Sequence, residues 1–121
     1  MNIFHVEDDG DIREIAKMAL EMVGDYKVVQ FECGEDALAA APDLTPDLFL
    51  LDVMMPGMTG PETLAKLREF DHLADVPVIY MTARVQPNEI AEFKSTGALG
   101  VIEKPFDPVT LGQQIRNLVP T

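Results

Sequence analysis

The sequence has very little cysteine, no tryptophan and no long hydrophobic run. Cys33 is the single cysteine among 121 residues, which excludes an internal disulfide and disfavours a cysteine-based zinc cluster. No apolar run approaches the roughly 20 residues that a membrane-spanning helix needs. The first residues also lack the positive segment and long apolar core of a signal peptide. These absences favour a soluble protein of a reducing compartment, and we expect a cytoplasmic location.

Basic residues are also scarce. The chain has 9 Lys and Arg residues against 21 Asp and Glu residues, which gives a formal net charge of −12. A chain this acidic is repelled by the phosphates of nucleic acids, so we expect no direct nucleic-acid binding. The excess of acidic over basic residues is compatible with cation binding and with a basic or apolar protein partner. For most of these charges, solubility is a sufficient explanation.

The remaining composition is that of an ordinary globular domain. Apolar residues make up 47% of the chain and charged residues 25%. A length of 121 residues is close to the commonest domain size and allows a sizeable core. Because no linker or low-complexity segment interrupts the sequence, we expect one domain over residues 1–121.

Two hydrophobic periods alternate along the whole chain. Short apolar runs that are typical of strands occur at residues 3–6, 26–31, 47–51, 76–81 and 100–103. Each run is followed by a segment with helical periodicity, at residues 12–23, 34–41, 60–70, 87–96 and 107–118. This alternation predicts an α/β domain, in which right-handed crossovers place helices on both faces of a parallel sheet.

Helical periodicity is clearest in the first of these helices. One apolar face is predicted for it, made of Ile12, Ile15, Ala16, Ala19, Met22 and Val23. Gly24 is expected to end this helix. The uniformly apolar residues 48–51 instead predict a strand that is covered on both faces.

Polar side chains stand where the apolar runs end. The residues at these points are Glu7, Asp8 and Asp9 after the first run, Asp52 after the third, Thr82 after the fourth and Lys104 after the fifth. In open α/β sheets, sites form outside the carboxyl ends of the strands, where the strand order reverses. We therefore expect these side chains to meet at one edge of the sheet.

This set of side chains favours phosphoryl chemistry. Crowded carboxylates need a counter-charge, which Mg²⁺ can supply while it retains several waters. Lys104 adds a second positive charge, and Thr82 adds a hydrogen-bond donor. Together they would stabilise charge on a transferring phosphoryl group, with Asp52 as the nucleophile that forms an acyl phosphate.

Four motifs also carry a family resemblance. They are Val6-Glu7-Asp8-Asp9, Leu51-Asp52-Val53-Met54-Met55-Pro56-Gly57, Met81-Thr82-Ala83 and Glu103-Lys104-Pro105-Phe106. In this order and spacing, they make the chain resemble the receiver domain of two-component response regulators over essentially all of its length. The resemblance implies a flavodoxin-like, CheY-like sheet with strand order 2-1-3-4-5.

The resemblance also implies roles for individual residues. Asp52 matches the phosphorylated aspartate, Thr82 the switch hydroxyl and Lys104 the phosphate-pairing lysine. Small Ala83 leaves space for the phosphoryl group, and the peptide bond between Lys104 and Pro105 is expected to be cis.

For the metal, the resemblance implies a Mg²⁺ site. It would be formed by Glu7, Asp8, Asp52 and the backbone carbonyl of Met54. Asp8 would be a direct ligand, whereas Glu7 would act through water. Asp9 stands one position too late to belong to this acidic pair.

The chain departs from the family pattern in two respects. Many receivers have an aromatic residue on the fifth strand that turns inward on activation, and the matching residue here is Val101, which is too small and stiff for that movement. In the family, the positions two residues after the aspartate and the threonine tune phosphoryl lifetime, and the matching residues here are Met54 and Arg84. Because a methionine side chain cannot orient an attacking water, we predict slow self-dephosphorylation, and loss of the acyl phosphate within seconds would contradict this.

The expected function is that of a single-domain receiver. A histidine kinase or a histidine phosphotransfer protein would phosphorylate Asp52, and the modified protein would contact a downstream protein target, without nucleic-acid or membrane binding. The protein would not be an enzyme beyond catalysing its own phosphoryl transfer and slow dephosphorylation. Two alternatives remain open. One is a receiver-fold binding module that takes no phosphate, and the other is a Mg²⁺-dependent phosphatase with an aspartate nucleophile.

Overall fold

The expected α/β architecture is confirmed by a computed structural model, which describes residues 1–83, 86–95 and 97–119. One parallel sheet has the order β2-β1-β3-β4-β5. Its strands are β1 (Asn2–Val6), β2 (Lys27–Phe31), β3 (Leu48–Asp52), β4 (Val78–Thr82) and β5 (Gly100–Glu103). The strand order reverses between β1 and β3, and this is where a site is expected in such a sheet.

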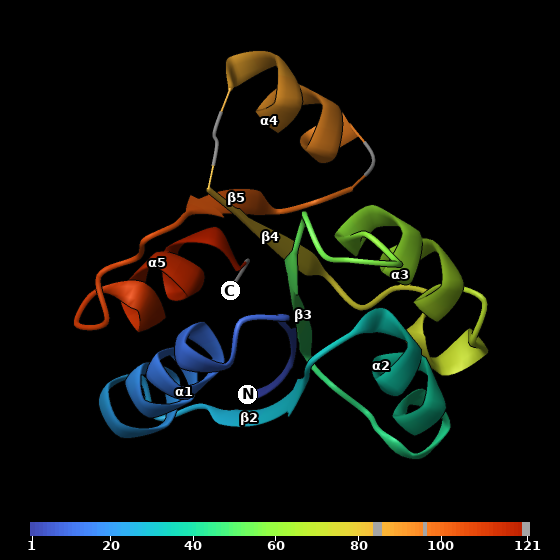
Figure 1. Cartoon of the computed structure of the whole chain (residues 1–121), viewed down its shortest axis with the longest axis horizontal. Helices are drawn as coiled ribbons and strands as arrows, with labels where there is room; N and C mark the ends of the chain where they lie inside the picture. Colours follow the sequence, from blue (N-terminus) through green and yellow to red (C-terminus); the bar gives the residue numbers. More distant parts are fainter. Residues whose placement is uncertain (84–85, 96, 120–121) are drawn as a thin grey trace.

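Helices cover both faces of the sheet. Their bounds are α1 (Gly10–Met18), α2 (Gly34–Ala40), α3 (Gly60–Leu67), α4 (Pro87–Ser95) and α5 (Leu111–Leu118). Figure 1 shows α1 and α5 together on one side of the sheet and α2 and α3 on the other, with α4 next to β5. Three short helical segments join these elements, namely η1 (Ala19–Val23), η2 (Ala41–Asp43) and η3 (Asp71–Leu73). Within the described ranges, no helix combines the length and apolarity that crossing a bilayer requires.

The core consists of two apolar layers, one on each side of β3. All five residues of β3 are buried, as its uniform apolarity predicted. Leu48 and Leu50 pack into the layer beneath α1 and α5, whereas Phe49 and Leu51 pack into the layer on the opposite side. Burial of one such side chain contributes roughly 1.5–3 kcal/mol. Asp52, the last residue of β3, is therefore held by a rigid central strand.

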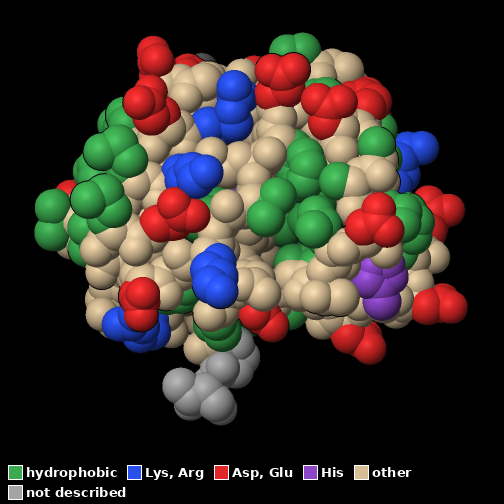
Figure 2. Space-filling view, turned by 90° about the horizontal axis from the view of Figure 1, so that it is seen from below, with side chains coloured by type: hydrophobic (Ala, Val, Ile, Leu, Met, Phe, Trp, Pro, Cys, Tyr) green, Lys and Arg blue, Asp and Glu red, His purple; other side chains and the backbone are tan. Residues whose placement is uncertain are grey.

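The predicted apolar face of the first helix is only partly correct. Three of its six residues are exposed, namely Ile15, Met22 and Val23, at 45%, 78% and 60%. After Met18 the helix becomes the π-helix η1, in which each hydrogen bond spans one more residue. The wider turn rotates the residues that follow it, so Leu20 enters the core instead. Figure 2, which views the molecule from the α1 and β2 side, shows hydrophobic side chains gathered over α1 at its left edge.

The start of the last helix also differs from the expected one. The last helix begins at Leu111 rather than at residue 107, because Asp107 forms a turn in which its side chain accepts a hydrogen bond from the Val109 amide at 2.9 Å. The fourth helix starts at Pro87 as expected, whereas its expected end at Thr96 lies outside the described residues.

Candidate functional site

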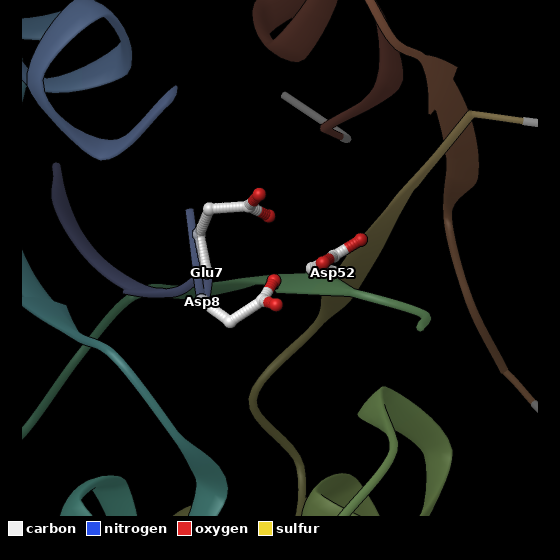
Figure 3. Close-up of side chains that lie close together, drawn as sticks. All are labelled: Glu7, Asp8 and Asp52. Carbon is white, nitrogen blue, oxygen red and sulfur yellow. The ribbon is translucent and has the colours of Figure 1, made fainter. Parts of the chain in front are cut away.

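Three carboxylates meet at the carboxyl ends of β1 and β3. Glu7 and Asp8 directly follow β1, and Asp52 ends the neighbouring strand β3. One oxygen from each carboxylate lies within 4.8 Å of the others, and Figure 3 shows the three side chains around a common space. Glu7 and Asp52 are buried, whereas Asp8 is exposed to solvent. Such a group of oxygen ligands suits a hard divalent cation that keeps part of its water shell.

Lys104 lies between the two buried carboxylates. Its Nζ is 3.1 Å from Oε1 of Glu7 and 3.0 Å from Oδ1 of Asp52. The residue follows β5, where its backbone amide donates to the carbonyl of Thr82 at 2.8 Å. The peptide bond to Pro105 is cis, as expected. Lys104 thus places a positive charge beside Asp52 from β5, which is two strands away in the sheet.

Burial and crowding shift the pKa values of these groups. Burial, followed by the nearby Asp52 charge, raises the pKa of Glu7 to about 7. Burial also raises the pKa of Asp52, although Lys104 opposes this shift. For Lys104, burial disfavours the charged form, but the hydrogen bonds to Asp52 and Glu7 outweigh it and raise the pKa. Without a metal ion, the site therefore carries more negative charge than Lys104 can balance. A divalent cation would supply the missing counter-charge, so the donor set fits Mg²⁺.

Proton binding to Glu7 should compete with Mg²⁺. Because the pKa of Glu7 is raised to about 7, this carboxyl is mostly protonated below that pH, and a cation must displace the proton. We expect the apparent affinity for Mg²⁺ to fall by about fivefold between pH 7 and pH 6, with proton release on binding. Isothermal titration calorimetry in two buffers that differ in ionisation enthalpy measures both quantities.

The Glu7→Gln variant is the control for this experiment. It should bind Mg²⁺ more weakly at pH 8 and should lose most of the change in affinity and of the proton release between pH 6 and pH 8. A wild-type Kd that is flat over this range would show that Glu7 does not compete with the metal.

Every side chain predicted for the site lines one open cleft of about 790 Å³. Its lining includes the acidic groups Glu7, Asp8 and Asp52, together with Met54, Thr82, Ala83 and Lys104. Thr82 is buried at the end of β4, and the Met54 side chain is 73% exposed. Arg84, the other predicted tuning position, lies outside the described residues.

Two residues near the acidic pair have structural roles. Asp9 caps α1, because its side chain accepts hydrogen bonds from the amides of Asp11 and Ile12 at 2.9 and 3.3 Å. Arg13, on the first turns of α1, donates to the carbonyl of Glu7 at 2.7 Å. Aspartate is one of the residues that N-cap positions favour. The Arg13 contact was missed, since it depends on how α1 folds back over the end of β1.

Gly60, at the start of α3, is a second residue that sequence reasoning missed. The helix begins with a capping box between Thr59 and Glu62. A Cβ atom on Gly60 would lie 2.4 Å from the carbonyl oxygen of Asp52, and the Gly60 amide donates to the carbonyl of Val53 at 3.0 Å. Because Gly60 has no side chain, the start of α3 can pack directly against the backbone of Asp52.

The aromatic side chains near the cleft come from β4 and α4 rather than from β5. Val101 of β5 is partly buried, and it pairs in register with Tyr80 of β4. The ring of Tyr80 lies 4.8 Å from the ring of Phe93 on α4, measured between centroids. Burial raises the pKa of Tyr80 to about 12, so its hydroxyl stays protonated. Phe93 also lines the cleft, together with Glu89 and Glu92 of α4. Sequence reasoning assigned none of these α4 side chains to the site.

Comparisons with known proteins agree with this geometry. The family model described as the response regulator receiver domain matches residues 3–116. The phosphate regulon transcriptional regulatory protein PhoB of Pseudomonas aeruginosa is 36% identical over 114 residues, which cover 94% of this chain and 49% of that protein. The response regulator Rre1 of Synechocystis is 33% identical over 119 residues, which cover 98% of this chain and 52% of that protein. The chain thus spans about half the length of these curated relatives.

Solved structures show the same likeness. The chemotaxis protein CheY4 of Vibrio cholerae, crystallised at low pH, superposes with a TM-score of 0.88 at 31% identity, and 98% of each chain is covered. The BeF3-activated receiver domain of DrrB gives a TM-score of 0.80 at 26% identity, covering 97% of this chain and 95% of that one. The fold, the four motifs and these matches agree, and the chain belongs to the response regulator receiver domain family.

Proposed function

We propose that Asp52 accepts a phosphoryl group from a phosphohistidine of a histidine kinase or a histidine phosphotransfer protein. An Oδ atom of Asp52 attacks phosphorus, an O–P bond forms, and the N–P bond breaks with its electron pair moving to the imidazole nitrogen. The observation that carries this proposal is the position of the Asp52 carboxylate. It lies 3.0 Å from Nζ of Lys104, beside two further carboxylates and at the base of an open cleft.

The surrounding residues would each support this transfer. Glu7, Asp8, Asp52 and the backbone carbonyl of Met54 would hold Mg²⁺, which when bound neutralises charge on the transferring phosphoryl group. Lys104 is close enough to pair with a phosphoryl oxygen on Asp52. Thr82, at the adjacent strand end, would donate its hydroxyl to a second oxygen. Preorganised donors of this kind stabilise the charge that develops during transfer.

Phosphorylation would act by shifting an equilibrium that exists before modification. We propose that the output surface is formed by α4, β5 and α5, and that it contacts a downstream protein. Some relatives are named as transcriptional regulators, but this chain spans about half of their length. The net charge of −12 argues that the receiver itself does not contact nucleic acid.

The test is incubation of the purified protein with a small phosphodonor, with Mg²⁺ or with EDTA, followed by intact-mass measurement. We expect one phosphoryl group per chain with Mg²⁺ and none with EDTA. Fragmentation should locate it on Asp52, and hydroxylamine should remove it because an acyl phosphate is labile to that reagent.

Other outcomes identify the alternatives. An unmodified protein that nevertheless adopts this fold would indicate a binding module that takes no phosphate. Sustained hydrolysis of a generic phosphate monoester would indicate a phosphatase. A label on any residue other than Asp52 would contradict the proposed acceptor.

A further inference from the structure

Helix α4 contributes two carboxylates to the wall of the phosphoacceptor cleft. Glu89 lies in the first turn of α4 and is half-buried, and Glu92 lies three residues later and is exposed. Residues three apart on a helix share one face, and both side chains line the same cleft as Asp52 and Lys104. Neither belongs to the compact carboxylate group of Glu7, Asp8 and Asp52. They therefore stand beside the reacting groups without being part of the expected metal site.

The cleft is strongly negative as a result. Six carboxylates line it, namely Glu7, Asp8, Asp9, Asp52, Glu89 and Glu92. Lys104 is the one Lys or Arg side chain among the described residues of this lining. Even with a bound divalent cation, the acidic side chains outnumber the positive charges among the described residues of the lining. An anionic phosphodonor that enters the cleft must approach against this field.

We propose that Glu89 and Glu92 set the phosphodonor preference of this receiver by charge, so that doubly charged acyl phosphates are disfavoured relative to phosphoramidates. This inference rests on the proposed phosphorylation of Asp52.

The two classes of donor react in the same way but differ in charge. With acetyl phosphate, the Asp52 oxygen attacks phosphorus and the P–O bond to acetate breaks. With zwitterionic phosphoramidate, the P–N bond breaks and its electron pair moves to nitrogen. Because this nitrogen is already fully protonated, neutral ammonia leaves without needing a further proton. Acetyl phosphate enters as a dianion at neutral pH, whereas zwitterionic phosphoramidate carries a single net negative charge. Phosphohistidine belongs to this second chemical class, since its phosphorus is also bonded to nitrogen.

A purely structural role for Glu89 makes a different prediction. An acidic residue in the first turn of a helix interacts favourably with the helix dipole and so stabilises the helix. Loss of that interaction would lower thermal stability, but it would not discriminate between two small donors. The ratio of donor rates is thus the measurement that separates the two roles.

The experiment compares the wild type, the double variant Glu89→Gln with Glu92→Gln, and a control. The control, Glu69→Gln with Asp71→Asn, removes two exposed carboxylates between the end of α3 and the start of η3, outside the lining of the cleft. Initial rates of Asp52 modification are measured by intact mass, with saturating Mg²⁺. Each donor is tested at about 20 mM and at about 500 mM ionic strength, where screening is weak and strong respectively.

At low ionic strength, we expect the double variant to react about fivefold faster than the wild type with acetyl phosphate and about twofold faster with phosphoramidate. These values correspond to the removal of two negative charges roughly 10 Å from the donor in water. Both gains should nearly vanish at high ionic strength, and the control should match the wild type. Equal changes for the two donors, or a gain that persists at high salt, would overturn the inference while leaving phosphorylation of Asp52 intact. Absence of labelling in the wild type with both donors would instead contradict the proposed function itself.

Discussion

Replacing Asp52 with asparagine is expected to abolish phosphoryl labelling completely and, in metal-free buffer at pH 8, to stabilise the fold by on the order of 1 kcal/mol. Labelling is lost because the amide is not a nucleophile for this transfer. Stability rises because one buried charge is removed from beside Glu7, and Lys104 then balances the remaining carboxylate.

The direction of this second effect follows from the pKa of Asp52. Burial raises that pKa, so the folded state disfavours the ionised carboxylate, and the resulting loss of stability grows as pH rises through the folded-state pKa. Urea denaturation with EDTA at pH 8 and at pH 4 measures the difference, which should be smaller at the lower pH. Added Mg²⁺ should stabilise the wild type more than the Asp52→Asn variant. A variant that is less stable than the wild type at pH 8 would show that the pairing with Lys104 outweighs the repulsion.

Replacing Lys104 with methionine should have the opposite effect on stability. Removing one partner of a buried charge pair costs about 3–5 kcal/mol, because the other charge is left without compensation. Here Glu7 and Asp52 would both lose their counter-charge. We expect a loss of about 3 kcal/mol at pH 8 in metal-free buffer, and a smaller loss at pH 5, where Glu7 is protonated. We also expect the rate of Asp52 phosphorylation to fall by about 100-fold. This is the typical effect of removing one preorganised hydrogen-bond donor that stabilises charge in the transition state.

Denaturation and donor kinetics on the same preparations test both parts of this prediction. Lys66→Met is a matched control, because Lys66 is an exposed lysine on α3 whose replacement also removes one positive charge. It should change neither stability nor rate by much. If Lys104→Met and Lys66→Met lose the same amount of stability, the contacts of Lys104 with Glu7 and Asp52 are not the cause.

The sequence was sufficient to predict the sheet and most of the cleft, for a simple physical reason. Asp52 and Lys104 each stand at the end of a run of apolar residues, and parallel strands bring their carboxyl ends to one edge. The type of a residue and its position along a strand can both be read from the local sequence. Residues that are far apart in the sequence could therefore be predicted to lie close together without knowledge of any contact between them. The strand order itself came from the family resemblance.

The parts that could not be predicted depend on packing between elements. Met22 and Val23 fit the helical period of α1, and only the change to a π-helix after Met18 turns them outward. Glu89 and Glu92 show the same limit, since their spacing is that of any solvated helix face. Their place in the cleft depends on where α4 lies beside β5, which residue periodicity does not determine.

The contact between Gly60 and Asp52 affects how freely the intervening loop can be altered. The chain is held at one end by the pairing of β3 with its neighbours and at the other by Gly60 against the Asp52 carbonyl. Residues 53–59 thus form a short segment whose two ends are fixed in place. The Met54 side chain is exposed within that segment, so it can be exchanged for a reporter group beside the cleft while its backbone carbonyl, the proposed metal ligand, stays in place. Exchange of exposed side chains, rather than replacement of the whole segment, is therefore the route to redesign that keeps Asp52 and the capping box of α3 in position.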